Sequence, residues 1–110
     1  MAHSKVSQRQ EGSLGILDCD LNFGMDSYES AFHAMEELVE AQVSGVAFNF
    51  SNTEYINSRG IHLIILLVEI ASEAGIALYV YGLNAHQKRI FSMVGLPDRL
   101  TLVEDEQEIQ

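Results

Sequence analysis

Hydrophobic residues recur along this chain with two spacings, and the spacings predict its secondary structure. Short apolar runs at residues 46–50 and 76–81 are typical of buried strands. The segment 58–74 carries leucine and isoleucine at helical spacing and is too long to be a strand. A polar turn separates it from the first run. The sequence therefore predicts a strand, a turn and a helix as its central unit.

Weaker patterns extend this unit in both directions. Residues 14–21 predict a strand with one face in water, residues 22–24 a turn, and residues 100–103 a short last strand. Residues 1–13 are polar, so we expect a flexible end or an edge strand. Residues 104–108 are acidic, as an exposed tail or a short helix would be.

Two further helices are predicted from their end signals and apolar faces. Asp26 and Glu29 have the spacing of a capping box, which would make Asp26 the N-cap of a helix that ends near Gln42. The last helix would run over residues 85–94 with Asn84 as its N-cap. We expect the two helices to turn inward Tyr28, Ala31, Phe32, Met35, Leu38 and Val39 in the first, and Ile90, Phe91 and Val94 in the second.

Strands and helices thus alternate over the whole chain. Such alternation is typical of an α/β fold, in which neighbouring strands are largely parallel and are connected by right-handed crossovers. With 110 residues the chain is long enough for one hydrophobic core. We expect a single domain over residues 14–110, built on a mixed β-sheet of four to five strands with interleaved helices.

Composition narrows the classes of partner. Lys and Arg total 6 against 16 Asp and Glu, and the formal net charge of -10 opposes binding to nucleic acid or to an anionic membrane surface. A basic protein partner or a locally cationic pocket fits this negative charge better. The longest apolar run, residues 63–68, is far shorter than a membrane span, and the N-terminus lacks the apolar stretch of a secretory signal. We therefore expect a cytoplasmic protein.

Few residues could support catalysis. The lone Cys19 cannot form a disulfide within the chain, and no Cys/His spacing suits zinc, so we expect no metal and no other cofactor. The sequence contains no glycine-rich phosphate loop and no nucleophile elbow. His62 follows Ser58 by one helical turn but has no identifiable orienting acid, so a small hydrolase is the weakest alternative. We expect a protein that is not an enzyme.

Ser58 is the candidate functional residue because it stands at the start of the long helix. Free backbone N–H groups and the positive end of the helix dipole meet there, which suits an anion or a phosphate. Serine and asparagine are also the preferred N-caps, so Asn57 and Ser58 could serve only to begin the helix. From the residues alone, the cap is the better supported interpretation.

A polar stripe on the same helix includes one leucine. His62, Glu69 and Glu73 continue from Ser58 at spacings of three to four residues, with Leu66 among them. If this face is exposed, the leucine beside a hydroxyl would form a small interface core with a polar rim. A single surface leucine, or one covered by the chain's tail, would give the same pattern.

Three segments resemble the STAS domain, the fold of bacterial anti-sigma factor antagonists. They are the strand end at Phe50-Ser51, the segment 55–61 (YINSRGI) and the segment 88–96 (KRIFSMVGL). The family pattern is Asp-Ser-Ser/Thr-Gly before a hydrophobic helix, and later Lys-Arg-Leu/Ile-Phe followed by Met and Gly-Leu. The resemblance covers about residues 14–103 and implies the STAS fold.

The resemblance also implies a function. In the family, the serine after the aspartate, here Ser58, is phosphorylated by an anti-sigma factor that is also a serine kinase of the histidine-kinase-like ATPase type. The unphosphorylated antagonist binds the kinase and frees the sigma factor, whereas the phosphorylated one is released and is reset by a PP2C-type phosphatase. We therefore expect a phosphoprotein that regulates transcription by partner switching. The partner-binding residues would be Asn57, Ser58, Arg59, Gly60, His62, Leu66 and Glu69.

Two positions depart from the family pattern. Asn57 replaces the usual aspartate, which keeps a capping oxygen but removes a charge. Arg59 replaces a small hydroxyl residue and could pair with a phosphate on Ser58 or contact an acidic kinase surface. The alternative is a non-switching STAS module, a structural or regulatory subunit of a larger assembly or of a membrane transport complex.

Overall fold

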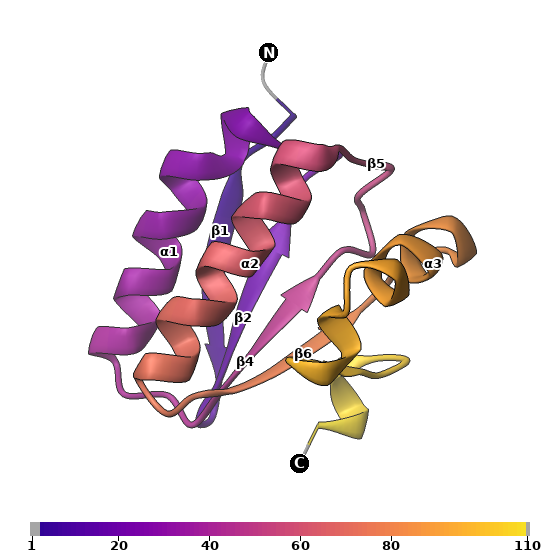
Figure 1. Ribbon diagram of the computed structural model, residues 1–110. Helices are drawn as coiled ribbons and strands as arrows, with labels where there is room; N and C mark the ends of the chain where they lie inside the picture. The colour runs from indigo at the N-terminus through magenta and orange to yellow at the C-terminus, as the bar shows by residue number, and fades with distance from the viewer. Residues whose placement is uncertain (1–2, 110) are drawn as a thin grey trace.

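Five strands form one sheet in the computed structural model, which describes residues 3–109 (Figure 1). Their order across the sheet is β1 (Val6–Glu11), β2 (Leu14–Cys19), β4 (Gly45–Asn49), β6 (Ala77–Tyr81) and β7 (Thr101–Leu102). β1 pairs with β2 in antiparallel fashion, and the other neighbours in this sheet are parallel. The predicted mixed sheet is confirmed, and the polar N-terminal segment supplies its edge strand.

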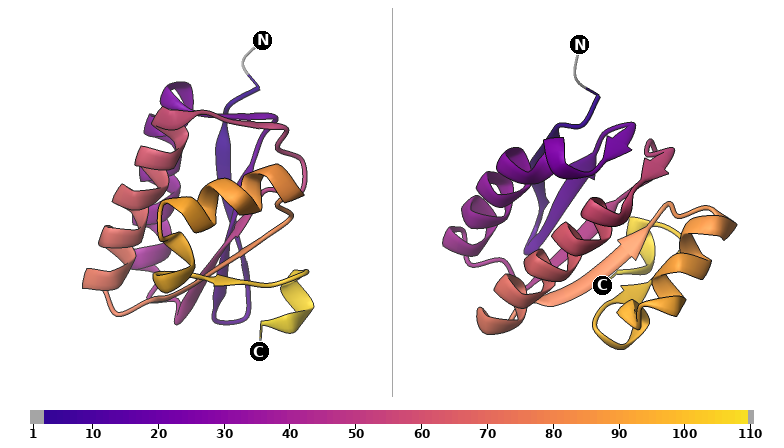
Figure 2. Two further views of the ribbon diagram at one scale, coloured as in Figure 1. Left: turned by 45° about the vertical axis from the view of Figure 1, so that its right-hand side comes forward. Right: turned by 45° about the horizontal axis from the view of Figure 1, so that its top comes forward.

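Three α-helices connect the parallel strands. They are α1 (Tyr28–Glu40), α2 (Ser58–Glu73) and α3 (Ala85–Met93), accompanied by the single-turn 3-10 helices η1 (Met25–Ser27), η2 (Leu96–Asp98) and η3 (Glu106–Glu108). Figure 2 shows α1 and α2 side by side on one face of the sheet, with the C-terminal segment and η3 on the other face. No helix within residues 3–109 has the length and apolar character that a membrane crossing requires.

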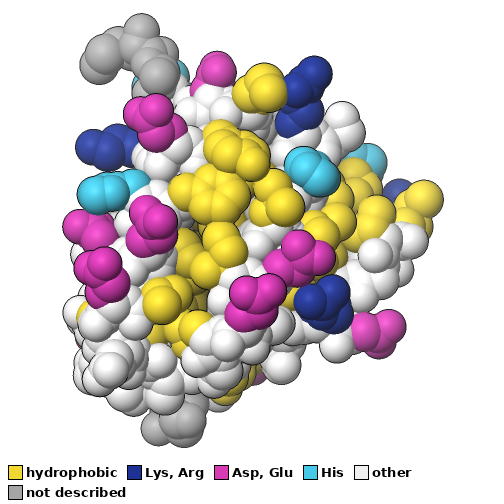
Figure 3. Space-filling model, turned by 60° about the vertical axis from the view of Figure 1, so that its left-hand side comes forward, with side chains coloured by type: hydrophobic (Ala, Val, Ile, Leu, Met, Phe, Trp, Pro, Cys, Tyr) yellow, Lys and Arg dark blue, Asp and Glu magenta, His cyan; other side chains and the backbone are white. Residues whose placement is uncertain are grey.

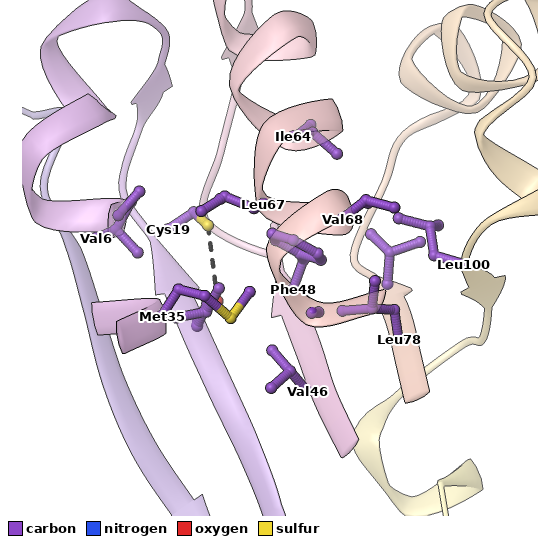
Figure 4. Packing of buried hydrophobic residues seen from close by; sticks show 14 of the residues in the cluster. Val6, Cys19, Met35, Val46, Phe48, Ile64, Leu67, Val68, Leu78 and Leu100 are labelled. Carbon is purple, nitrogen blue, oxygen red and sulfur yellow. Dashed lines mark hydrogen bonds between the residues drawn. The ribbon is translucent and has the colours of Figure 1, made fainter. Parts of the chain in front are cut away.

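The main core lies between α1, α2 and the sheet. Ile64, Leu67 and Val68 of α2 are fully buried in one cluster with Val46 and Phe48 of the central strand β4 (Figure 4). Each such side chain contributes about 1.5–3 kcal/mol when it leaves water. The long apolar run of α2 is therefore what fixes this helix on the sheet, as its periodicity predicted.

Two short strands form a second sheet beside the start of α2. β3 (Asn22–Phe23) pairs in parallel with β5 (Tyr55–Ile56), two residues each. The prediction of a turn at residues 22–24 was wrong, because the Leu21 carbonyl accepts the N–H groups of Glu54 and Tyr55 and brings the two loops together. Backbone pairing between distant segments leaves no pattern in so short a sequence.

The start of α1 also differs from its prediction. Asp26 is exposed and lies in η1, and the N-cap of α1 is Ser27. The buried Ser27 hydroxyl accepts the Gly24 N–H at 3.2 Å, which closes the η1 turn before α1 begins. Tyr28 is 43% exposed and Val94 47% exposed, so neither turns inward as expected. Val94 leaves the inner face because α3 ends at the residue before it.

The helix ends that were predicted from Asn and Gly residues are found in the structure. Asn84 caps α3: its side-chain oxygen accepts the Gln87 N–H at 2.8 Å, and Gln87 Oε1 accepts the Asn84 N–H at 3.0 Å. Gly75 follows α2 with a φ of +74°, a left-handed conformation that favours glycine. These signals place the end of α2 and the start of α3 where they were predicted.

Candidate functional site

The small β3–β5 sheet positions the first turn of α2. The Phe23 carbonyl accepts the Asn57 N–H at 3.3 Å, which extends the pairing to the residue before the helix. Gly60 lies so close to the same carbonyl that a Cβ at this position would collide with it. A glycine is therefore needed here for close packing of the helix start on β3.

Asn57 is the N-cap of α2. Its backbone is extended, with φ −89° and ψ −179°, and its Oδ1 accepts the Gly60 N–H at 2.8 Å. Ser58 is the first residue of the helix and does not supply the cap. Of the two capping residues that the sequence left open, the structure thus selects Asn57.

The Ser58 hydroxyl is free and accessible. Ser58 is exposed, and within residues 3–109 its Oγ has no hydrogen-bond partner, His62 included. It stands on the first turn of a 16-residue helix, where the dipole is positive and the N–H groups of the first turn are unpaired within the helix. The arrangement offers an oxygen that can be modified and surroundings that tolerate negative charge.

Exposed apolar side chains surround this turn. Met25 is 55% exposed and Tyr55 62% exposed, and Arg59 Nη1 lies 3.2 Å from Met25 Sδ. Met25, Tyr55 and Asn57 contribute to a shallow hollow of about 370 Å³, lined also by His3, Ser4, Asn22, Phe23, Gly24 and Asp26. Met25 and Tyr55 were not predicted as part of the site, since an exposed apolar residue in a short segment cannot be told from a buried one in the sequence.

The other predicted partner-binding residues follow α2 away from this turn. His62 and Glu69 are exposed and Leu66 is half-buried, so the predicted stripe does face outward. The chain's tail lies on the opposite face of the sheet and leaves the stripe uncovered (Figure 2). Gly60 is buried and positions the turn without contributing to its surface. The roles of these residues in binding stay a prediction.

Three perturbed titratable groups, Arg9, Tyr81 and Glu106, lie together on the sheet face opposite α1 and α2. Arg9 Nε donates to Asp18 at 2.7 Å, Arg9 Nη2 donates to Glu106 at 2.9 Å, and the Tyr81 hydroxyl donates to Glu106 at 3.2 Å. The Arg9 hydrogen bond lowers the pKa of Glu106. Burial, followed by the Glu106 charge, raises the pKa of Tyr81 to about 12. This cluster binds the C-terminal segment to the sheet and is structural.

Potential metal ligands are dispersed over the part of the chain that the structure describes. Within residues 3–109, no three His, Cys, Asp or Glu side chains stand close enough together to hold a metal ion. Cys19 is buried in the core, with its thiol directed at the Leu17 carbonyl (Figure 4). Burial raises the pKa of this thiol, which opposes formation of the reactive thiolate.

Comparison with known proteins identifies the family. A protein-family model of the STAS domain matches residues 6–109. The chain belongs to the STAS domain family. The resemblance predicted for about residues 14–103 is thereby confirmed, and the match extends beyond this range at both ends. A search of curated protein sequences finds no match to the chain.

Solved structures share this STAS fold at low sequence identity. The anti-sigma factor antagonist SpoIIAA is 8% identical in its unphosphorylated form (TM-score 0.74, 94% of this chain and 91% of that chain). Its phosphorylated form, a Bacillus cell fate determinant, is 10% identical (TM-score 0.72, covering 94% of this chain and 96% of that chain). An anti-sigma factor antagonist from Mycobacterium paratuberculosis is 13% identical (TM-score 0.75, covering 94% of this chain and 87% of that chain). A variant of RsbS from Moorella thermoacetica is 14% identical (TM-score 0.72, covering 93% of this chain and 88% of that chain).

Proposed function

We propose that this STAS domain is an anti-sigma factor antagonist in a partner-switching cascade. Unphosphorylated, it binds an anti-sigma factor that is also a serine kinase of the histidine-kinase-like ATPase type. Phosphorylation of Ser58 releases it, and a PP2C-type phosphatase restores the binding form. The observation that carries this proposal is the exposed, unbonded Ser58 hydroxyl, which a kinase can reach because Asn57 supplies the helix cap.

The structural neighbours support this assignment. SpoIIAA shares the fold and is described as an anti-sigma factor antagonist, with both an unphosphorylated and a phosphorylated form solved. By analogy, the present chain acts by binding a protein partner in the cytoplasm and regulates transcription without catalysing a reaction itself. Within residues 3–109, the histidine nearest in sequence to Ser58, His62, makes no hydrogen bond to it.

Charge at Ser58 would control docking. A phosphoserine carries a charge of about −1.5 to −2 and three strongly solvated oxygens. The surface around Ser58 includes the exposed side chains of Met25 and Tyr55, which lose water when a partner covers them. Burying a phosphate in such a contact costs desolvation, and an acidic partner surface adds repulsion. Phosphorylation therefore weakens a contact that the neutral hydroxyl permits.

Incubation with the cognate kinase and ATP should add one phosphate, at Ser58. Mass spectrometry of the peptide that ends at Arg59 locates the phosphate, and Ser58→Ala serves as the unlabelled control. Ser58→Asp should weaken kinase binding by about tenfold or more, because the interface must desolvate a charge. Ser72→Asp, at an exposed position in the last turn of the same helix, should leave the affinity unchanged.

Three outcomes would contradict the switch. They are label on another residue, no label with a kinase of verified activity, and equal affinity of wild type and Ser58→Asp. Asn57 and Arg59, the two departures from the family motif, favour the alternative of a non-switching subunit in a larger assembly or a membrane transport complex. In that case the unlabelled protein would purify with that assembly and without a kinase.

A further inference from the structure

The outer surface of α1 and α2 carries a band of partly exposed apolar side chains. Tyr28, Phe32 and Val39 lie on one side of α1, and the rings of Tyr28 and Phe32 are 4.6 Å apart. Leu66 and Ile70 lie on one side of α2. Figure 3 shows hydrophobic side chains gathered down this face of the molecule. We call these five residues the α1–α2 band.

One contact shows that the two halves of the band face each other. Arg59, Leu66 and Ile70 share one side of α2, because they are spaced by seven and four residues. Arg59 contacts Met25, immediately before α1, so this side of α2 is turned toward α1. The band therefore fills the seam between the two helices.

Carboxylates line both sides of the band. Glu29, Glu36 and Glu40 follow the outer face of α1, and Glu69 and Glu73 follow the outer face of α2, all of them exposed. Within residues 3–109, none of these five side chains has an ion-pair or hydrogen-bond partner. Acidic side chains are visible on both sides of the apolar band in Figure 3. Five uncompensated negative charges thus surround a water-exposed apolar surface.

We propose that the α1–α2 band docks a basic amphipathic helix of a partner protein. An apolar helix face would lie along the seam, and Lys or Arg on its flanks would meet the carboxylates on either side. A second copy of this chain is a poor occupant, because two molecules of charge -10 would bring like-charged rims together. The acidic rims equally repel nucleic acid and anionic lipid.

This proposal goes beyond the partner switch, because docking at the band needs neither a kinase nor phosphorylation of Ser58. Ser58 stands at one end of α2, whereas the band extends along both helices. Leu66 in the band and Glu69 on its rim are also predicted kinase-binding residues, so variants of the α1 rim, where no kinase-binding residue is predicted, separate the two activities. Loss of one activity without the other distinguishes the two sites.

A synthetic amphipathic peptide of leucine and lysine tests the proposal. In NMR titrations of the full chain we expect shifts at Phe32, Leu66 and Ile70. Calorimetry should show at least tenfold weaker binding to Glu36→Lys/Glu40→Lys. The matched control Glu54→Lys/Glu108→Lys changes the net charge equally at exposed positions off the band and should bind as wild type. A scrambled peptide of equal charge should bind at least tenfold more weakly.

Further variants separate apolar from ionic contributions. Leu66→Ser should weaken peptide binding several-fold at unchanged secondary structure, and Ser58→Asp should leave it unchanged. Shifts confined to other surfaces, equal weakening by both double variants, or tight binding of the scrambled peptide would overturn the proposal. Concentration-dependent shifts of the band residues without peptide would overturn it as well, because the occupant would then be a second copy.

Discussion

Asn57 and Ser58 have different roles at the start of α2: Asn57 caps the helix, and Ser58 presents a free hydroxyl. Asn57 Oδ1 accepts the Gly60 N–H, so the Ser58 hydroxyl is left for a partner or a kinase. Asn57→Ala should lower the free energy of unfolding by about 1 kcal/mol, because the cap is lost. Asn57→Asp keeps the capping oxygen and adds an anion at the positive end of the helix dipole, which stabilises by about 0.3–1 kcal/mol.

Urea denaturation of the two variants and wild type measures this difference. If Asn57→Ala were as stable as wild type, the side-chain cap would contribute nothing and Ser58 could have served in its place. The sequence named Asn57 and Ser58 as capping candidates but could not choose between them, because both residue types cap well. The choice depends on the backbone, which is extended at Asn57 and helical from Ser58 onward.

The first turn of α2 is held in place by β3, a strand that the sequence did not reveal. Gly60→Ala tests this contact. In an ordinary helix interior, alanine is more favourable than glycine by about 1 kcal/mol. Here the added Cβ would collide with the Phe23 carbonyl, and overpacking costs about 1–3 kcal/mol. We expect a net loss of stability on the order of 1 kcal/mol in urea denaturation, with Ser72→Ala as the exposed control in the same helix.

A gain in stability on Gly60→Ala would show that α2 moves freely away from β3.

The contrast between α2 and β3 explains what the sequence could predict. α2 was predicted because sixteen residues show several periods of an apolar face. β3 and β5 have two residues each, too few for any period, and pair where the Leu21 carbonyl joins their loops. The apolar surroundings of Ser58 were missed for this reason.

The two faces of the sheet are covered by different segments. α1 and α2 cover one face with the main apolar core (Figure 2). The C-terminal segment is bound to the other face through Arg9, Glu106 and Tyr81 and through a smaller apolar cluster. The lowered pKa of Glu106 means that its stabilising contribution is present above its usual pKa of 4.5 and is lost as the pH falls through the lowered value. Acid should therefore weaken the attachment of the C-terminal segment to the sheet.

The Tyr81 hydroxyl stabilises the same cluster, and its contribution is lost at alkaline pH. Its pKa in the folded domain, about 12, exceeds the ordinary value of 10.0, so its contribution is complete below pH 10.0 and is lost as the pH rises through about 12. In a phenolate absorbance titration, one of the 4 tyrosines should ionise last, and this step should vanish in Tyr81→Phe. Glu106→Gln removes a neighbouring charge but leaves the burial, so the step should move below 12 yet stay above 10.0. An unchanged last step in Glu106→Gln, with circular dichroism showing the domain folded, would mean that Glu106 does not act on Tyr81 and does not bind the segment through it.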